Sequence, residues 1–128
     1  MYVRFITHTH DEDSGRRQGL FQAMAELRKN RDFPEHDAQI YNEIYDWFRH
    51  NLSTPNTFTR SARPHAKNVA ISWFKDTASE HISKMRAAAQ ILQAHGVIVE
   101  VLYVERPGYI VYEDEFQVTA EPFKETTT

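Results

Sequence analysis

The alternation of apolar and polar residues is most informative between residues 68 and 105. Residues 69–74 form a short apolar run, which predicts a buried strand. After this run, apolar residues recur at steps of three and four, the spacing of the buried face of an amphipathic helix; they are Ile82, Met85, Ala89 and Leu92. Residues 97–104 are rich in β-branched side chains and predict a second strand.

Helix signals separate these two strands. Asp76 and Thr77 offer a helix start, with Glu80 placed after Thr77 as in a capping box. His95–Gly96 predicts the helix end, since glycine accepts a left-handed backbone. Strand, helix and strand indicate a βαβ unit, whose two strands run parallel with a right-handed crossover. One long helix over residues 64–95 is the alternative. We favour the strand because a new helix start follows the apolar run at once.

The N-terminal half predicts one strand and two helices. Residues 2–7 are β-prone, and residues 8–13 follow as a polar loop. A helix capped at residues 13–14 buries an apolar face, formed by Leu20, Phe21, Met24 and Leu27. A proline marks the start of a second, strongly aromatic helix over residues 34–51. The connection is short, so the two helices are expected to form an antiparallel pair.

The C-terminal part predicts an antiparallel meander. Residues 109–112 have the pattern of a strand that pairs back on the strand at residues 97–104. The acidic residues 113–115 form the next turn, and residues 116–120 are the last strand. We therefore expect a single α+β domain over residues 1–123. Its mixed sheet of about five strands contains the βαβ unit and the meander, and about three helices cover it. Residues 124–128 are expected to be a disordered tail.

Composition limits the classes of protein. With 128 residues, 41% of them hydrophobic and 26% charged, the chain has the length and make-up of one globular domain. It contains no cysteine, so disulfides, thiolate zinc sites and cysteine nucleophiles are excluded. The first residues lack the pattern of a signal peptide, and no apolar run could cross a bilayer. We expect a cytoplasmic protein without a membrane partner and without a cofactor.

The position of the charges changes this picture more than the net charge of −3 does. Between Asp46 and Asp76 the chain has no acidic residue, while it has five cations; they are Arg49, Arg60, Arg63, Lys67 and Lys75. His50 and His65 lie in the same interval. Guanidinium groups bind phosphate in a bidentate manner, so this interval predicts an anionic ligand.

A second basic stretch lies at the predicted start of the first helix. Arg16 and Arg17 follow Gly15 there, and a helix start offers free backbone N–H groups to an anion. The predicted anion-binding residues are therefore Arg16, Arg17, Arg60, Arg63, His65 and Lys67. Solvated basic loops are the competing interpretation. Nucleic acid is the other partner that such cations could meet, with Phe58 as a platform for stacking. Trp73 is a second candidate platform, and a position in the core is its favoured interpretation.

Histidines are the candidates for metal binding and catalysis. His8 and His10 alternate beside Asp11, so two imidazoles and a carboxylate could share a metal ion. An exposed polar loop explains the same residues, and we expect no metal. His65 and His81 are the candidate acid/base groups. A surface position on the helix is the competing interpretation of His81.

Two segments, residues 71–75 and 108–118, resemble segments of small uncharacterised bacterial proteins. This resemblance implies no activity and no site residues. Three functions therefore stay open. The first is a domain that binds an anionic small molecule. The second is an enzyme that acts on a phosphorylated or nucleotide-like substrate with a histidine acid/base. The third is a homodimeric interaction protein that buries an edge strand or the aromatic second helix.

Overall fold

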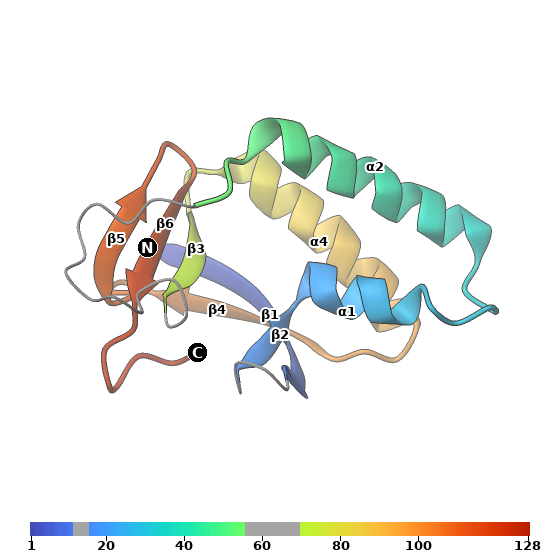
Figure 1. The fold of residues 1–128 in the computed structure, drawn as a ribbon, viewed down its shortest axis with the longest axis horizontal. Coiled ribbons are helices and arrows are strands. Elements are labelled where there is room, and N and C mark those ends of the chain that lie inside the picture. The colour runs from blue at the N-terminus through green and yellow to red at the C-terminus, as the bar shows by residue number, and fades with distance from the viewer. Residues whose placement is uncertain (12–15, 56–69) are drawn as a thin grey trace. The chain divides into compact units, whose positions relative to one another are not determined.

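The structure is a computed structural model that describes residues 1–11, 16–55 and 70–128. Its α+β class is the predicted one, because the described residues form six strands in one sheet together with three helices. Figure 1 shows these elements in chain order: β1 (Tyr2–His10), β2 (Arg17–Gly19), α1 (Leu20–Leu27), α2 (Glu35–Asn51), β3 (Ile71–Lys75), α4 (Ser79–Ala94), β4 (Val99–Val104), β5 (Tyr109–Glu113) and β6 (Gln117–Glu121).

The strand order in the sheet is β2-β1-β3-β6-β5, and β4 also pairs with β1. β3 is the strand predicted at residues 69–74, so the alternative of one long helix over residues 64–95 is wrong. The antiparallel pairing of β5 with β6 is confirmed. The meander is wrong in its first step, because β5 lies at the sheet edge beside β6 and β4 pairs with β1 instead. β6 pairs antiparallel with β3 on its other side.

The predicted βαβ unit needs a correction. β3, α4 and β4 follow one another as expected, but β3 does not pair with β4. Each of these strands pairs with β1 instead, and the pairing of β1 with β3 is antiparallel. The two strands of the predicted βαβ unit, which carry Trp73 and Val99, are therefore not neighbours in the sheet. A crossover helix returns the chain to the same sheet, but it does not determine which strand lies in between.

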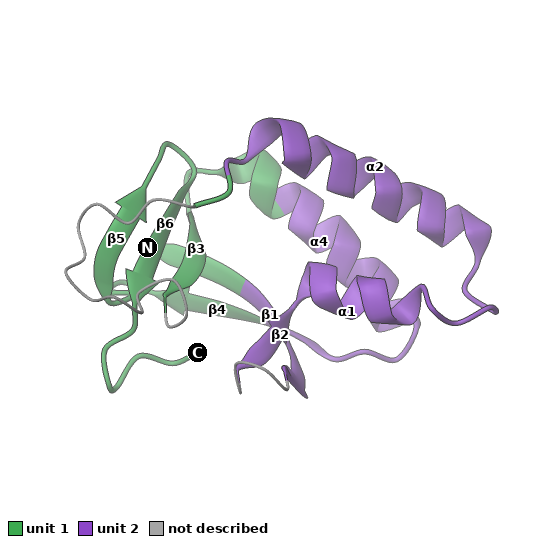
Figure 2. Ribbon diagram, in the orientation of Figure 1, with its two compact units in different colours: residues 1–4, 54–82, 101–128 green, residues 5–53, 83–100 purple. Residues whose placement is uncertain are grey.

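Two compact units divide the chain (Figure 2). Unit 1 contains residues 1–4, 54–82 and 101–128, and unit 2 contains residues 5–53 and 83–100. β1, α4 and β4 contribute residues to both units. The single domain over residues 1–123 and the disordered tail after it stay predictions.

In unit 1 the core is built on β3 and β6. Trp73 lies opposite Val118 and Ile71 lies opposite Ala120, and all four side chains are buried. Cross-strand apolar pairs of this kind are the main stabilising contacts of an antiparallel sheet. They explain why the short apolar run of β3 forms a strand although it also fits helical spacing.

In unit 2 the first helix begins later than its sequence suggests. The backbone of Gly19 is extended (φ −75°, ψ 167°), and α1 starts only at Leu20. Residues 17–19 form the strand β2 instead, which pairs antiparallel with β1. The predicted cap at residues 13–14 falls outside the described residues. A strand of only three residues is too short to show a period-two signal in the sequence.

Aromatic side chains join α1 to α2 in unit 2. α2 covers the predicted range, with Pro34 before its first residue, and buries Tyr41, Ile44 and Phe48. The ring of Phe21 from α1 lies 5.2 Å from that of Phe48, and Arg28, after the end of α1, lies over Tyr41. Residues early in one helix thus meet residues late in the other, which is the predicted antiparallel arrangement.

The sequence predicts the end of α4 better than its start. The helix begins at Ser79, with the carbonyl of Ala78 accepting from the N–H of Ile82 at 3.0 Å. A helix start at Asp76 is therefore too early. The Asp76 carboxylate lies 3.4 Å from the backbone nitrogen of Met1 instead. Gly96 follows the helix with φ 82°, so the predicted glycine end is confirmed. In the described part of the chain, no helix is both long and apolar enough to cross a membrane.

Candidate functional site

The candidate site lies in unit 2, where β1 and β2 form a hairpin. β1 extends to His10, so His8 and His10 belong to a strand and not to the predicted polar loop. Both side chains are exposed. The N–H of Asp11 donates to the carbonyl of Arg16 at 2.6 Å, which joins the two strands at this end of the hairpin. The cross-strand pairing extends β1 beyond the β-prone residues that the sequence pattern identifies.

This hairpin brings together residues that the sequence assigned to two separate sites. His10 is the direct cross-strand partner of Arg17, so their side chains leave the sheet on the same side. His10 was a candidate metal ligand and Arg17 a candidate anion ligand. Their proximity follows from the register of the strands.

Glu100 from β4 completes the cluster. Arg17 Nη1 donates to Glu100 Oε2 at 2.7 Å. His8 Nε2 lies 3.5 Å from the same carboxylate oxygen. The side chains of Arg17, Glu100 and His8 are 22%, 41% and 55% exposed, so a solute can reach the oxygen that they share. We call these three residues and His10 the hairpin cluster.

The chemistry of the hairpin cluster favours a negatively charged oxygen. Arg17 from β2 and His8 from β1 lie at the same carboxylate oxygen of Glu100, and His10 is next to Arg17 across the hairpin. Charge-assisted hydrogen bonds of this type are short and roughly twice as strong as neutral ones. The cluster therefore already binds one anionic group, which belongs to the chain itself.

Metal binding by the histidines has less structural support. Among residues 1–11, 16–55 and 70–128, no group of three or more histidine and carboxylate side chains could hold a metal ion. Asp11, the carboxylate that the sequence placed beside the histidines, accepts a hydrogen bond from Gln22 at 3.2 Å.

The structure describes only some of the other predicted anion-binding residues. Arg16 is half-buried directly before β2. Arg60, Arg63, His65 and Lys67 lie outside the described residues, so their role stays a prediction. Two further cations of the acid-free interval are described: Lys75 pairs with Glu113 at 2.7 Å, and Arg49 is exposed on α2.

His81 is neither on the surface nor open to a substrate. Only 3% of it is exposed. Its ring lies 4.3 Å from that of Phe116 and 6.1 Å from that of Phe74, all within unit 1. The surface interpretation of His81 was therefore wrong, because the first turn of α4 packs this side chain against the aromatic residues of the sheet.

The acidic turn before β6 is held by hydrogen bonds to one of its carboxylates. Asp114 accepts hydrogen bonds from the backbone N–H groups of Phe116 and Gln117, at 2.9 and 3.1 Å. The Tyr112 hydroxyl and the Gln117 amide donate to its other oxygen. Burial alone raises the pKa of Asp114, but these hydrogen bonds outweigh it and lower the pKa.

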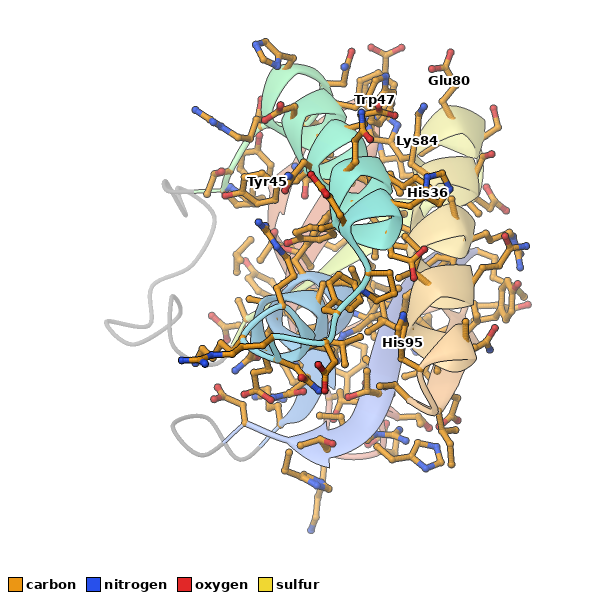
Figure 3. All side chains as sticks on the ribbon, turned by 90° about the vertical axis from the view of Figure 1, so that its right-hand side faces the viewer. His36, Tyr45, Trp47, Glu80, Lys84 and His95 are labelled. Atoms are coloured by element: carbon orange, nitrogen blue, oxygen red, sulfur yellow. The ribbon has the colours of Figure 1, made fainter. Side chains whose placement is uncertain are left out.

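The structure contains a histidine–carboxylate pair that the sequence did not predict. His95 Nε2 lies 2.9 Å from Asp37 Oδ2, and the Phe33 ring lies 4.9 Å from the imidazole. At the other end of the same helix pair, the Lys84 ammonium lies 5.6 Å from the centre of the Trp47 ring (Figure 3). The first turn of α2 thus meets the end of α4, so the two helices are antiparallel in unit 2.

Glu100 was also missed, although the sequence carries a signal for it. It is the one charged residue in the otherwise apolar segment 97–102. A charge within such a strand indicates either a solvent-facing position or a partner. Its partner, Arg17, is 83 residues away in the chain, so only the fold could identify it.

Comparison with known proteins gives no relative. The chain matches no protein-family model, and neither a curated protein nor a solved structure is significantly similar to it.

Proposed function

We propose that this protein is a small binding domain for an anionic ligand that carries a phosphate or carboxylate group. The observation that supports it is the hairpin cluster, in which Arg17 and His8 lie at one carboxylate oxygen and His10 is the cross-strand partner of Arg17. Donors from two strands are already oriented toward a single anionic atom. Binding therefore requires little ordering of side chains, which is a major cost of association.

The remaining predicted residues extend this proposal. Arg16 is next to Arg17 in the chain. Arg60, Arg63, His65 and Lys67 belong to the interval without acidic residues, and we assign them to the same kind of ligand on sequence grounds. Arginine suits this role because its planar guanidinium matches the geometry of phosphate and carboxylate oxygens.

The test is a titration of the full chain with inorganic pyrophosphate, followed by the backbone amide signals in NMR spectra and by calorimetry. Binding at the hairpin cluster shifts the signals of His8, His10 and Arg17 in a saturable manner. His10→Ala is the informative variant, because the exposed side chain of His10 is not needed for the core. We expect it to weaken binding about three- to tenfold, the effect of removing one hydrogen bond to a charged group.

His36→Ala is the matched control. His36 is an exposed histidine on α2 in the same unit and lies outside the hairpin cluster. This variant is expected to bind pyrophosphate as the wild type does. No saturable binding of pyrophosphate, inorganic phosphate or a nucleoside triphosphate would refute the proposed function.

An enzymatic function has one observation in its favour, the pair of Asp37 and His95. A carboxylate that holds one ring nitrogen orients the imidazole, and the other nitrogen can then accept a proton. His81 is less suited, because it is buried. Hydrolysis of p-nitrophenyl phosphate that His95→Asn abolishes and His36→Ala leaves intact would support this alternative.

A further inference from the structure

The inference concerns Glu100 and rests on the proposed function. Its carboxylate occupies the position at which an external anion would meet Arg17. The distance from Arg17 Nη1 to Glu100 Oε2 is 2.7 Å, and His8 Nε2 is 3.5 Å from the same oxygen. An external anionic oxygen cannot take this place while the carboxylate remains there.

We infer that Glu100 is an intramolecular competitor that the ligand must displace. A group attached to the same chain acts at an effective concentration in the millimolar range or above, without the translational cost of a free ligand. A dissolved monoanion such as acetate makes the same contacts as Glu100 and must exceed that concentration to bind. The cluster therefore excludes simple carboxylates at lower concentrations.

The ligand class follows from this competition. A phosphate monoester carries a charge of about −1.5 to −2 at neutral pH and three acceptor oxygens, against one charge and two oxygens for a carboxylate. One phosphate group can accept from Arg17 and from His8 or His10 at the same time. The anion that displaces Glu100 is thus a terminal phosphate or pyrophosphate group.

The chain contains a second ion pair that serves as a control. Lys75 Nζ and Glu113 Oε2 are also 2.7 Å apart, in unit 1. The Glu113 side chain is 37% exposed, close to the 41% of Glu100. Glu100→Gln and Glu113→Gln therefore remove the same charge, from ion pairs of equal length and similar exposure.

The experiment measures pyrophosphate and acetate binding by calorimetry for the wild type, Glu100→Gln and Glu113→Gln. We expect Glu100→Gln to bind pyrophosphate about tenfold more tightly than the wild type, because the Glu100 carboxylate no longer competes for Arg17. Glu113→Gln is expected to stay within about twofold of the wild type. Acetate is expected to bind measurably only to Glu100→Gln. Thermal melting checks that both variants are folded.

The possible outcomes separate this inference from the proposed function. If the wild type binds pyrophosphate and Glu100→Gln binds it equally or more weakly, Glu100 is not a competitor, while the binding function stands. Tighter binding by Glu113→Gln alone would place the ligand near Lys75 and also overturn the inference. If neither the wild type nor Glu100→Gln binds any phosphate, the proposed function is wrong and the inference falls with it.

Discussion

His95 Nε2 lies 2.9 Å from Asp37 Oδ2, and this contact joins two helices whose partner residues are 58 positions apart in the chain. The imidazole follows the last residue of α4, and the carboxylate lies in the first turn of α2. The Asp37 carboxylate is favourable where it stands, since a helix start stabilises an anion. The two side chains are 24% and 25% exposed, so water screens the pair only in part.

Removal of this contact is expected to destabilise unit 2. His95→Ala should lower the free energy of unfolding by about 1 to 2 kcal/mol, the usual contribution of a partly buried hydrogen bond to a charged group together with the lost ring contact with Phe33. Chemical denaturation monitored by circular dichroism measures this change. His36→Ala, at an exposed position of α2, should change the free energy of unfolding by less than about 0.5 kcal/mol.

A double-mutant cycle gives the stricter test of the pair. If Asp37 and His95 act together, Asp37→Asn with His95→Ala should cost less than the sum of the two single substitutions. Additive effects would mean that the contact contributes nothing to stability.

Asp114, in the turn before β6, should make the free energy of unfolding depend on pH. Hydrogen bonds from Gln117, Phe116 and Tyr112 lower the pKa of Asp114 below its ordinary value. The stabilisation is therefore fully present above the ordinary pKa of an aspartate and is lost as the pH falls through the lowered value. Asp114→Ala should remove this part of the acid dependence and cost about 1 to 2 kcal/mol at neutral pH.

Thermal melting between neutral and acidic pH measures this effect. Glu115→Ala provides the control, because Glu115 is the exposed neighbour in the same turn. An unchanged acid dependence in Asp114→Ala would show that other carboxylates are responsible.

Gly108 is expected to tolerate no side chain. Its φ is 135°, and an added Cβ would collide with the backbone carbonyl of Glu121 and lie 2.8 Å from Pro122 Cα. Gly108→Ala should therefore lower the free energy of unfolding by more than about 2 kcal/mol, through backbone strain and overpacking. Gly19→Ala should be close to neutral, since an added Cβ there meets nothing within 4 Å. Equal urea midpoints for the two variants would contradict this expectation.

His81 is expected to serve the core of unit 1. His81→Ala should destabilise the fold by about 2 to 4 kcal/mol, because it leaves a cavity between Phe74 and Phe116. At a temperature where the variant is folded, its affinity for pyrophosphate should equal that of the wild type. Loss of binding by a folded His81→Ala would instead return this histidine to the candidate site residues.

The fold was predictable where the information is local. The aromatic spacing of residues 34–51 defines α2, because side chains three and four positions apart share one face of a helix. Gly96 ends α4 as expected, since its left-handed backbone is a property of a single residue. β5 and β6 are neighbours in the chain, so a short turn is enough to pair them.

The candidate site was predictable only as separate parts. The residue types of His8, His10 and Arg17 indicated binding chemistry, but in two unrelated hypotheses. Glu100 was not among the candidates. The strand that sets Arg17 opposite His10 has only three residues, and the ion-pair partner of Arg17, Glu100, is 83 positions away in the chain. Such pairing has no periodic signal in the sequence.

By itself, the sequence determined the α+β class, most helix and strand ranges and the kinds of side chain that could meet an anion. Propensity, amphipathic spacing and glycine positions act over a few residues, which is why these features can be read along the chain. Only the tertiary structure decided that β1 pairs with both β3 and β4, that His81 is buried and that Arg17 binds Glu100. Those outcomes depend on which distant surfaces pack together, and many pairings satisfy the same local pattern.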